Sequence, residues 1–109
     1  MIDTKLPKTI RIGPFDYKIV ILSAVETVEK NVYGECANLQ QEIRMRAKYE
    51  SYSACADTFI HECLHALWWI MNIKEADNEE RVVTTLATGL TMLLRDNDWL
   101  AAWLNRFNK

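Results

Sequence analysis

The spacing of apolar residues changes once along this chain, at about Ser51. Before that point apolar residues recur at every second position, and after it at every third or fourth. The first spacing is typical of strands with one buried face, and the second is typical of amphipathic helices. Turn-forming residues also lie mainly in the first third, at Pro7, Gly13, Pro14 and Gly34. The sequence therefore predicts an α+β domain in which a small N-terminal antiparallel sheet precedes the helices.

Three to four strands are expected. Residues 10–12 and 17–21 are rich in β-branched and aromatic side chains, and they flank residues 13–16, which form a predicted hairpin turn. A third strand is predicted from Val32 toward Cys36. The alternation from Gln40 to Tyr49 (residues 40–49) predicts a half-buried strand at a sheet edge, with charged side chains on its outer face.

Three helices are expected after the sheet. The first runs from about residue 54 to 72 with Ser53 as its N-cap, and the second follows Asp77 and Asn78. Residues 96–98 interrupt the pattern before a short terminal helix. In so small a domain most of the helical aromatic residues are predicted to be core. They are Trp68, Trp69, Trp99, Trp103 and Phe107.

Composition narrows the class of protein. The chain has 109 residues, half of them hydrophobic, and a net charge of −2, which fits one domain over residues 1–109. Without a basic block it is a poor candidate for binding nucleic acid. Its longest clear apolar run has six residues, against about 20 needed to span a membrane. With no apolar signal segment at the start and no CxxC, a cytoplasmic location is expected.

The sequence HECLH, from His61 to His65, lies in the middle of the first predicted helix. Residues four apart stack on one helix face, so both imidazoles can bind one Zn²⁺. Glu62 lies beside that pair, where it can take a proton from a metal-activated water and return it to a leaving amine. Cys63 points to the opposite side and is predicted to be a core residue.

Two histidines on a largely apolar helix could also be ordinary core residues. However, the chain has only two histidines, and both fall in this motif. In a shuffled sequence of the same composition this arrangement would arise roughly once in several hundred trials. The helix was also predicted from periodicity alone, independently of the motif. We therefore favour a metal site.

A catalytic zinc site needs a third protein ligand and an open position for water. Glu79 and Glu80 begin the next helix and would return alongside the motif helix after a turn. Both could instead be first-turn acids, with Asp77 and Glu80 forming a capping box. Periodicity alone does not decide between the two glutamates. Asp57, one turn before His61, could orient an imidazole from outside the ligand set.

Residues 58–67 resemble the active-site helix of zincin metallopeptidases, and more closely that of small single-domain proteins from bacteriophages and prophages. The resemblance extends to residues 10–13 and 17–19, to Tyr33 and Gly34, and to a closing pattern that runs from Glu80 through Gly89 to Asn97. It implies a minimal gluzincin in which His61, His65 and Glu80 hold zinc, with Glu79 as the alternative third ligand. Glu62 is then the general base.

The same resemblance implies a substrate that is a protein or peptide, in a bacterial host cell. In zincins an edge strand before the motif helix pairs with the substrate, and residues 40–49 are predicted to be that strand. Their basic residues Arg44, Arg46 and Lys48 would favour an acidic substrate, although they could simply protect a free edge. The alternative function is a phage regulatory or assembly protein that keeps the fold and binds a partner without proteolysis.

Overall fold

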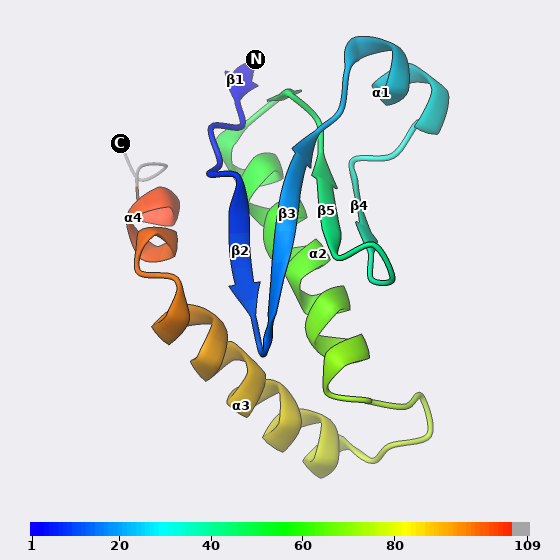
Figure 1. The fold of residues 1–109 in the computed structure, drawn as a ribbon, viewed down its shortest axis with the longest axis vertical. Coiled ribbons are helices and arrows are strands. Elements are labelled where there is room, and N and C mark those ends of the chain that lie inside the picture. The colour runs from blue at the N-terminus through cyan, green and yellow to red at the C-terminus, as the bar shows by residue number, and fades with distance from the viewer. Residues whose placement is uncertain (106–109) are drawn as a thin grey trace.

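The computed structural model describes residues 1–105, so Phe107 lies outside the described residues. It is an α+β domain with an N-terminal sheet followed by helices, as the sequence predicts (Figure 1). The strands are β1 (Ile2–Asp3), β2 (Thr9–Ile12), β3 (Phe15–Ile21), β4 (Gly34–Ala37), β5 (Glu42–Met45) and β6 (Lys48–Tyr49). The helices are α1 (Ala24–Lys30), α2 (Tyr52–Ile70), α3 (Glu79–Asp96) and α4 (Trp99–Asn105).

The main sheet has the strand order β2-β3-β5-β4. The predicted hairpin is confirmed, since β2 and β3 are antiparallel around Gly13, whose φ of +57° suits glycine. The expectation of a purely antiparallel sheet is wrong in one place, because β3 and β5 run parallel with Ile19 opposite Ile43. The intervening α1 and β4 reverse the chain, so β5 enters the sheet between β3 and β4.

The single edge strand predicted over residues 40–49 is also wrong. The structure divides it into β5 and β6, and β5 is hydrogen-bonded on both sides, by β3 and β4. The chain leaves the sheet at Arg46 and Ala47, where the Ala47 carbonyl accepts from the Thr4 amide and β6 pairs with β1 instead. The edges of the main sheet are therefore β2 and β4.

Helix α2 crosses one face of this sheet (Figure 1). Its N-cap is Ser51, whose hydroxyl accepts from the Ala54 amide, two residues before the predicted cap. The buried side of α2 packs against the inner side chains of the strands, and Cys63 is fully buried there, as expected. The other core members of α2 are Cys55, Phe59, Ala66 and Leu67.

Helix α3 packs on α2 and β2 through a face centred on Thr85, Gly89 and Leu93. A Cβ atom at Gly89 would lie 3.0 Å from Leu67 Cδ2, so glycine allows the two helices to approach closely. Val83 is exposed, although its spacing from Leu86 and Leu90 predicts that it shares their apolar face of the helix. The break at residues 96–98 is confirmed between α3 and α4.

Two short elements, helix α1 and strand β1, escaped the sequence prediction. Helix α1 has no buried residue, so no apolar spacing marks it. Its sequence sign is the capping box of Ser23 and Glu26, in which each side chain bonds the other's backbone amide.

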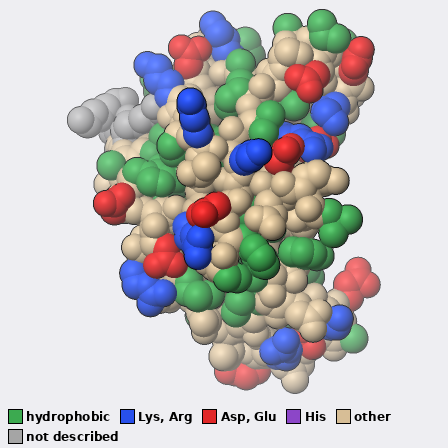
Figure 2. Space-filling model, viewed as in Figure 1, with side chains coloured by type: hydrophobic (Ala, Val, Ile, Leu, Met, Phe, Trp, Pro, Cys, Tyr) green, Lys and Arg blue, Asp and Glu red, His purple; other side chains and the backbone are tan. Residues whose placement is uncertain are grey.

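The face of the molecule in Figure 2 shows basic and acidic side chains in mixed groups. Within residues 1–105, every helix is too short or too polar to cross a bilayer.

Candidate metal centre

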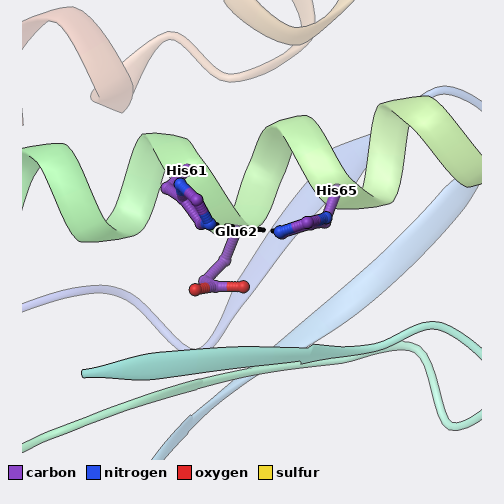
Figure 3. A group of neighbouring side chains, drawn as sticks. All are labelled: His61, Glu62 and His65. Atoms are coloured by element: carbon purple, nitrogen blue, oxygen red, sulfur yellow. Dashed lines mark hydrogen bonds between the residues drawn. The ribbon is translucent and has the colours of Figure 1, made fainter. Parts of the chain in front are cut away.

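Helix α2 brings His61, Glu62 and His65 together, as the motif predicts (Figure 3). The Nε2 atoms of the two imidazoles lie 3.1 Å apart. One ligand atom from each of the three residues falls within 4.8 Å of the others, and in residues 1–105 this is the one such group of three potential metal ligands. Both histidines are exposed to solvent.

The separation of the imidazoles suits a single zinc ion. Two nitrogens bound to zinc at about 2.0–2.1 Å with a tetrahedral angle lie about 3.3–3.4 Å apart. The 3.1 Å between His61 Nε2 and His65 Nε2 needs only a small adjustment to reach that value. The helical spacing of four residues therefore already brings both donor atoms to about the separation that one zinc ion requires.

Glu62 points from α2 toward the strands (Figure 3) and is only 6% exposed. Its burial follows from the approach of β4, where a Cβ atom at Gly34 would lie 3.4 Å from Glu62 Cγ. Burial raises the pKa of Glu62 above its usual value, an effect that His61 and His65 oppose. Among residues 1–105 this carboxylate has no hydrogen-bond or ion-pair partner. A buried carboxylate in this state is costly, and a water held by a metal on the histidines would supply the missing donor.

Three pockets meet at the histidines. The first, of about 320 Å³, lies between α2 and the start of β4 and is lined by Tyr33, Gly34, Asp57, Thr58, His61 and Glu62. The second, of about 400 Å³, lies on the outer face of α2 and is lined by His61, Leu64, His65, Trp68 and Glu75. The third, of about 460 Å³, lies toward the end of α2 and is lined by Asn38, His65, Trp68, Trp69, Asn72, Ile73 and Lys74.

The glutamates predicted to complete the ligand set lie outside this group. Glu79 and Glu80 are exposed in the first turn of α3, and Glu80 accepts a hydrogen bond from Thr84. Their helix is capped by Asn78, whose side chain accepts from the Arg81 amide, so the capping box of Asp77 and Glu80 does not form.

The loop between α2 and α3 supplies a different carboxylate. Glu75 lines the same pocket as both histidines, and the sequence analysis did not single it out. The loop is folded back by the Asp77 side chain, which accepts from the Lys74 amide and pairs with Arg81. No periodicity marks a loop residue of this kind, so only the tertiary structure reveals it.

Asp57 and Tyr33 lie at the other end of the site. Asp57 lines the first pocket with His61, consistent with the expected position beside an imidazole, although no hydrogen bond joins the two. Tyr33, also missed from the sequence as a site residue, lies on the opposite wall, with the Arg46 guanidinium 4.6 Å from its ring centroid.

The basic residues expected to attract an acidic substrate are engaged within the chain. Arg44 pairs with Glu35 at 2.8 Å and with Glu42 at 2.9 Å. Arg46 donates to the Val32 carbonyl, and Lys48 pairs with Asp3 of β1. These contacts leave the acidic-substrate expectation without structural support.

The expectation that Trp68 and Trp69 are core residues is wrong. They are 38% and 47% exposed, whereas Trp103 is buried and makes an edge-on contact with Phe59. Helix α2 is apolar around most of its circumference, but the sheet and α3 cover only part of it. Two indoles therefore remain at the surface beside the histidines.

Comparison with known proteins found no match: no protein-family model, curated protein or solved structure is significantly similar to this chain.

Proposed function

We propose that this chain is a zinc-dependent metallopeptidase of the zincin type. The observation that carries the proposal is the group of His61, Glu62 and His65, with two imidazole nitrogens 3.1 Å apart beside a buried carboxylate that has no partner in residues 1–105. An ordinary pair of core histidines would be buried and bonded to backbone or side-chain groups. These two are exposed and face each other at the junction of three pockets.

In this proposal His61 and His65 hold the zinc ion. When bound, zinc lowers the pKa of a coordinated water to about 7 and polarises the substrate carbonyl. Glu62 accepts the proton of the attacking water and returns it to the leaving amine. A raised carboxylate pKa suits both halves of this task, because a base must also release its proton as an acid.

Glu80 is the proposed third ligand, as the resemblance to gluzincins implies, and Glu79 is its neighbour on the same turn of α3. Glu75 is the rival that the geometry offers, since it lines a pocket with both histidines. Zinc affinity of Glu75→Gln, Glu79→Gln and Glu80→Gln, measured with a competing chelator, separates the three. Substitution of the glutamate that binds zinc should raise the dissociation constant for zinc at least tenfold. The other two substitutions should leave this constant close to that of wild type.

The substrate backbone is proposed to pair with β4. This strand is the edge of the sheet that packs against α2. Its first residue, Gly34, lines one of the three pockets, and Asn38, which follows its last residue, lines another. An extended peptide added there would continue the sheet past the histidines. Strand β4 thus takes the place of residues 40–49 as the proposed substrate-binding strand, because β5, within those residues, is already paired on both sides.

Metal analysis of the purified protein, combined with a peptide-hydrolysis screen, tests the function. We expect one zinc per chain in wild type and in Glu62→Gln, and none in His61→Ala. Hydrolysis should occur in wild type alone. No zinc in wild type, even after zinc is offered, would refute the proposal. Zinc without any hydrolysis would favour the alternative, a phage regulatory or assembly protein that binds a partner through this fold.

A further inference from the structure

The pocket on the outer face of α2 combines two features that are typical of ligand-binding pockets. Its wall is mostly apolar and includes Leu64 and the indole of Trp68, yet it also contains the carboxylate of Glu75. We call this cavity, lined by His61, Leu64, His65, Trp68 and Glu75, the Trp68 pocket. At about 400 Å³ it is large enough for a long side chain.

Glu75 has no ion-pair or hydrogen-bond partner among residues 1–105. Of the other charged groups in its loop, Asp77 pairs with Arg81 at 3.3 Å and also accepts from the Lys74 backbone amide, whereas the Lys74 ammonium forms no ion pair within residues 1–105. Glu75 is thus the one carboxylate on the wall of the Trp68 pocket, and its charge is uncompensated within the described chain.

An indole and a free carboxylate can each bind a cationic side chain. Trp is the strongest aromatic partner for Lys and Arg, and a carboxylate forms charge-assisted hydrogen bonds with both. The apolar wall at Leu64 suits the methylene stem of such a side chain, which packs on apolar surface while its charged end stays wet.

We propose that the Trp68 pocket binds the side chain of a basic residue, arginine or lysine, next to the scissile bond of the substrate. The position follows from His61 and His65, which line this pocket and also form the proposed zinc site. The inference therefore rests on the proposed function for the cleavage step, but the binding preference of the pocket does not depend on cleavage.

A binding experiment isolates this preference. Zinc-loaded Glu62→Gln protein is titrated with N-acetyl-arginine amide, N-acetyl-norleucine amide and N-acetyl-glutamate amide, and the indole resonance of Trp68 is followed by NMR after assignment with Trp68→Phe. The arginine probe should bind about fivefold more tightly than the norleucine probe, the value of a modest ion pair, and the glutamate probe should not bind. Equal affinity for arginine and norleucine, or no shift with any probe, would overturn the inference.

Glu75→Gln in the same background should remove the preference for arginine while leaving norleucine binding unchanged. Glu29→Gln, the same substitution on the exposed surface of α1, should keep the preference and so controls for net charge. Loss of zinc from Glu75→Gln would identify Glu75 as a metal ligand and would also overturn the inference.

Hydrolysis provides the second readout. Wild-type protein should cleave peptides with arginine or lysine beside the scissile bond faster than matched peptides with norleucine, and Glu75→Gln should lose that ratio. Selective binding of the arginine probe without hydrolysis of any peptide would refute the peptidase and leave the pocket as a recognition site. Hydrolysis with a preference for norleucine would refute the pocket and leave the peptidase.

Discussion

Gly34 sets the distance between β4 and helix α2, and replacing it with alanine should therefore destabilise the protein. The new Cβ atom would lie 2.8 Å from Thr58 Cγ2, 3.2 Å from the Arg44 carbonyl oxygen and 3.4 Å from Glu62 Cγ. Carbon atoms in contact prefer about 3.5–4.0 Å, so β4 and α2 must separate by several tenths of an ångström. Thr58 is β-branched, so its χ1 angle on a helix is confined to two rotamers and its methyl group has few positions to which it can move.

The magnitude follows from two opposing effects. Overpacking of this kind costs about 1–3 kcal/mol. Alanine also makes the unfolded chain less flexible than glycine does, which stabilises the folded state by about 0.4–1 kcal/mol. We therefore expect Gly34→Ala to lower the free energy of unfolding by about 1–2 kcal/mol, a difference well above the error of urea denaturation monitored by tryptophan fluorescence in the presence of a chelator.

Thr58→Ser supplies the matched test, because it removes the Cγ2 atom that the new Cβ would meet. The double variant Gly34→Ala/Thr58→Ser should recover about half of the loss, since the contact with the Arg44 carbonyl remains. The coupling between the two substitutions should be about 0.5–1 kcal/mol and stabilising. If Gly34→Ala is as stable as wild type, or if Thr58→Ser adds its own cost without any recovery, then β4 does not contact α2 as described.

Three further outcomes can be measured by the same unfolding assay. Asn97→Ala should cost about 2–3 kcal/mol, because the Asn97 amide bonds both backbone groups of Arg11 and a carbonyl of α3; a cost below 1 kcal/mol would contradict this bridge. Ser51→Ala should cost about 1 kcal/mol through loss of the α2 cap, whereas Ser53→Ala, at the cap predicted from sequence, should cost close to nothing. In metal-free protein Glu62→Gln should be stabilising at neutral pH, because burial raises the pKa of the folded carboxyl above that of the unfolded chain. In wild type the stability of the protein with a neutral Glu62 carboxyl is fully present below pH 4.5 and is lost as the pH rises through the raised pKa. The difference in stability between Glu62→Gln and wild type should therefore vanish in acid. A difference that is constant at all pH values would refute this prediction.

The elements that sequence predicts well are those whose burial follows one repeating spacing. The hairpin of β2 and β3 and the helices α2 and α3 were recognisable because one face of each is buried over several turns or pleats. Helix α1 buries nothing, and β1 and β6 are two residues long and pair across more than 40 residues. Neither kind of element leaves a spacing pattern in the chain.

The alternation over residues 40–49 was real but did not define one strand. Met45 and Tyr49 both remain buried while the backbone between them leaves the sheet. The Tyr49 hydroxyl stabilises the backbone where it leaves the sheet, because it accepts from the Arg46 amide and donates to the Tyr33 carbonyl. A buried aromatic side chain thus preserved the two-residue period across a break in hydrogen bonding.

The candidate metal centre likewise has a part that the sequence predicts and a part that it does not. His61, Glu62 and His65 belong to one helix, so local geometry fixes their arrangement and the motif predicted it. The position of Glu79 and Glu80 depends on how α3 packs, and that packing is decided by small residues, which the apolar spacing does not mark. Thr85 and Gly89 face inward in place of Val83, because the missing Cβ of Gly89 lets the helix approach Leu67. The orientation of α3 about its own axis also sets the direction in which Glu79 and Glu80, in its first turn, point. A wider residue at Gly89 should therefore change zinc affinity if the third ligand lies on α3, and should leave it unchanged if the ligand is Glu75 of the preceding loop.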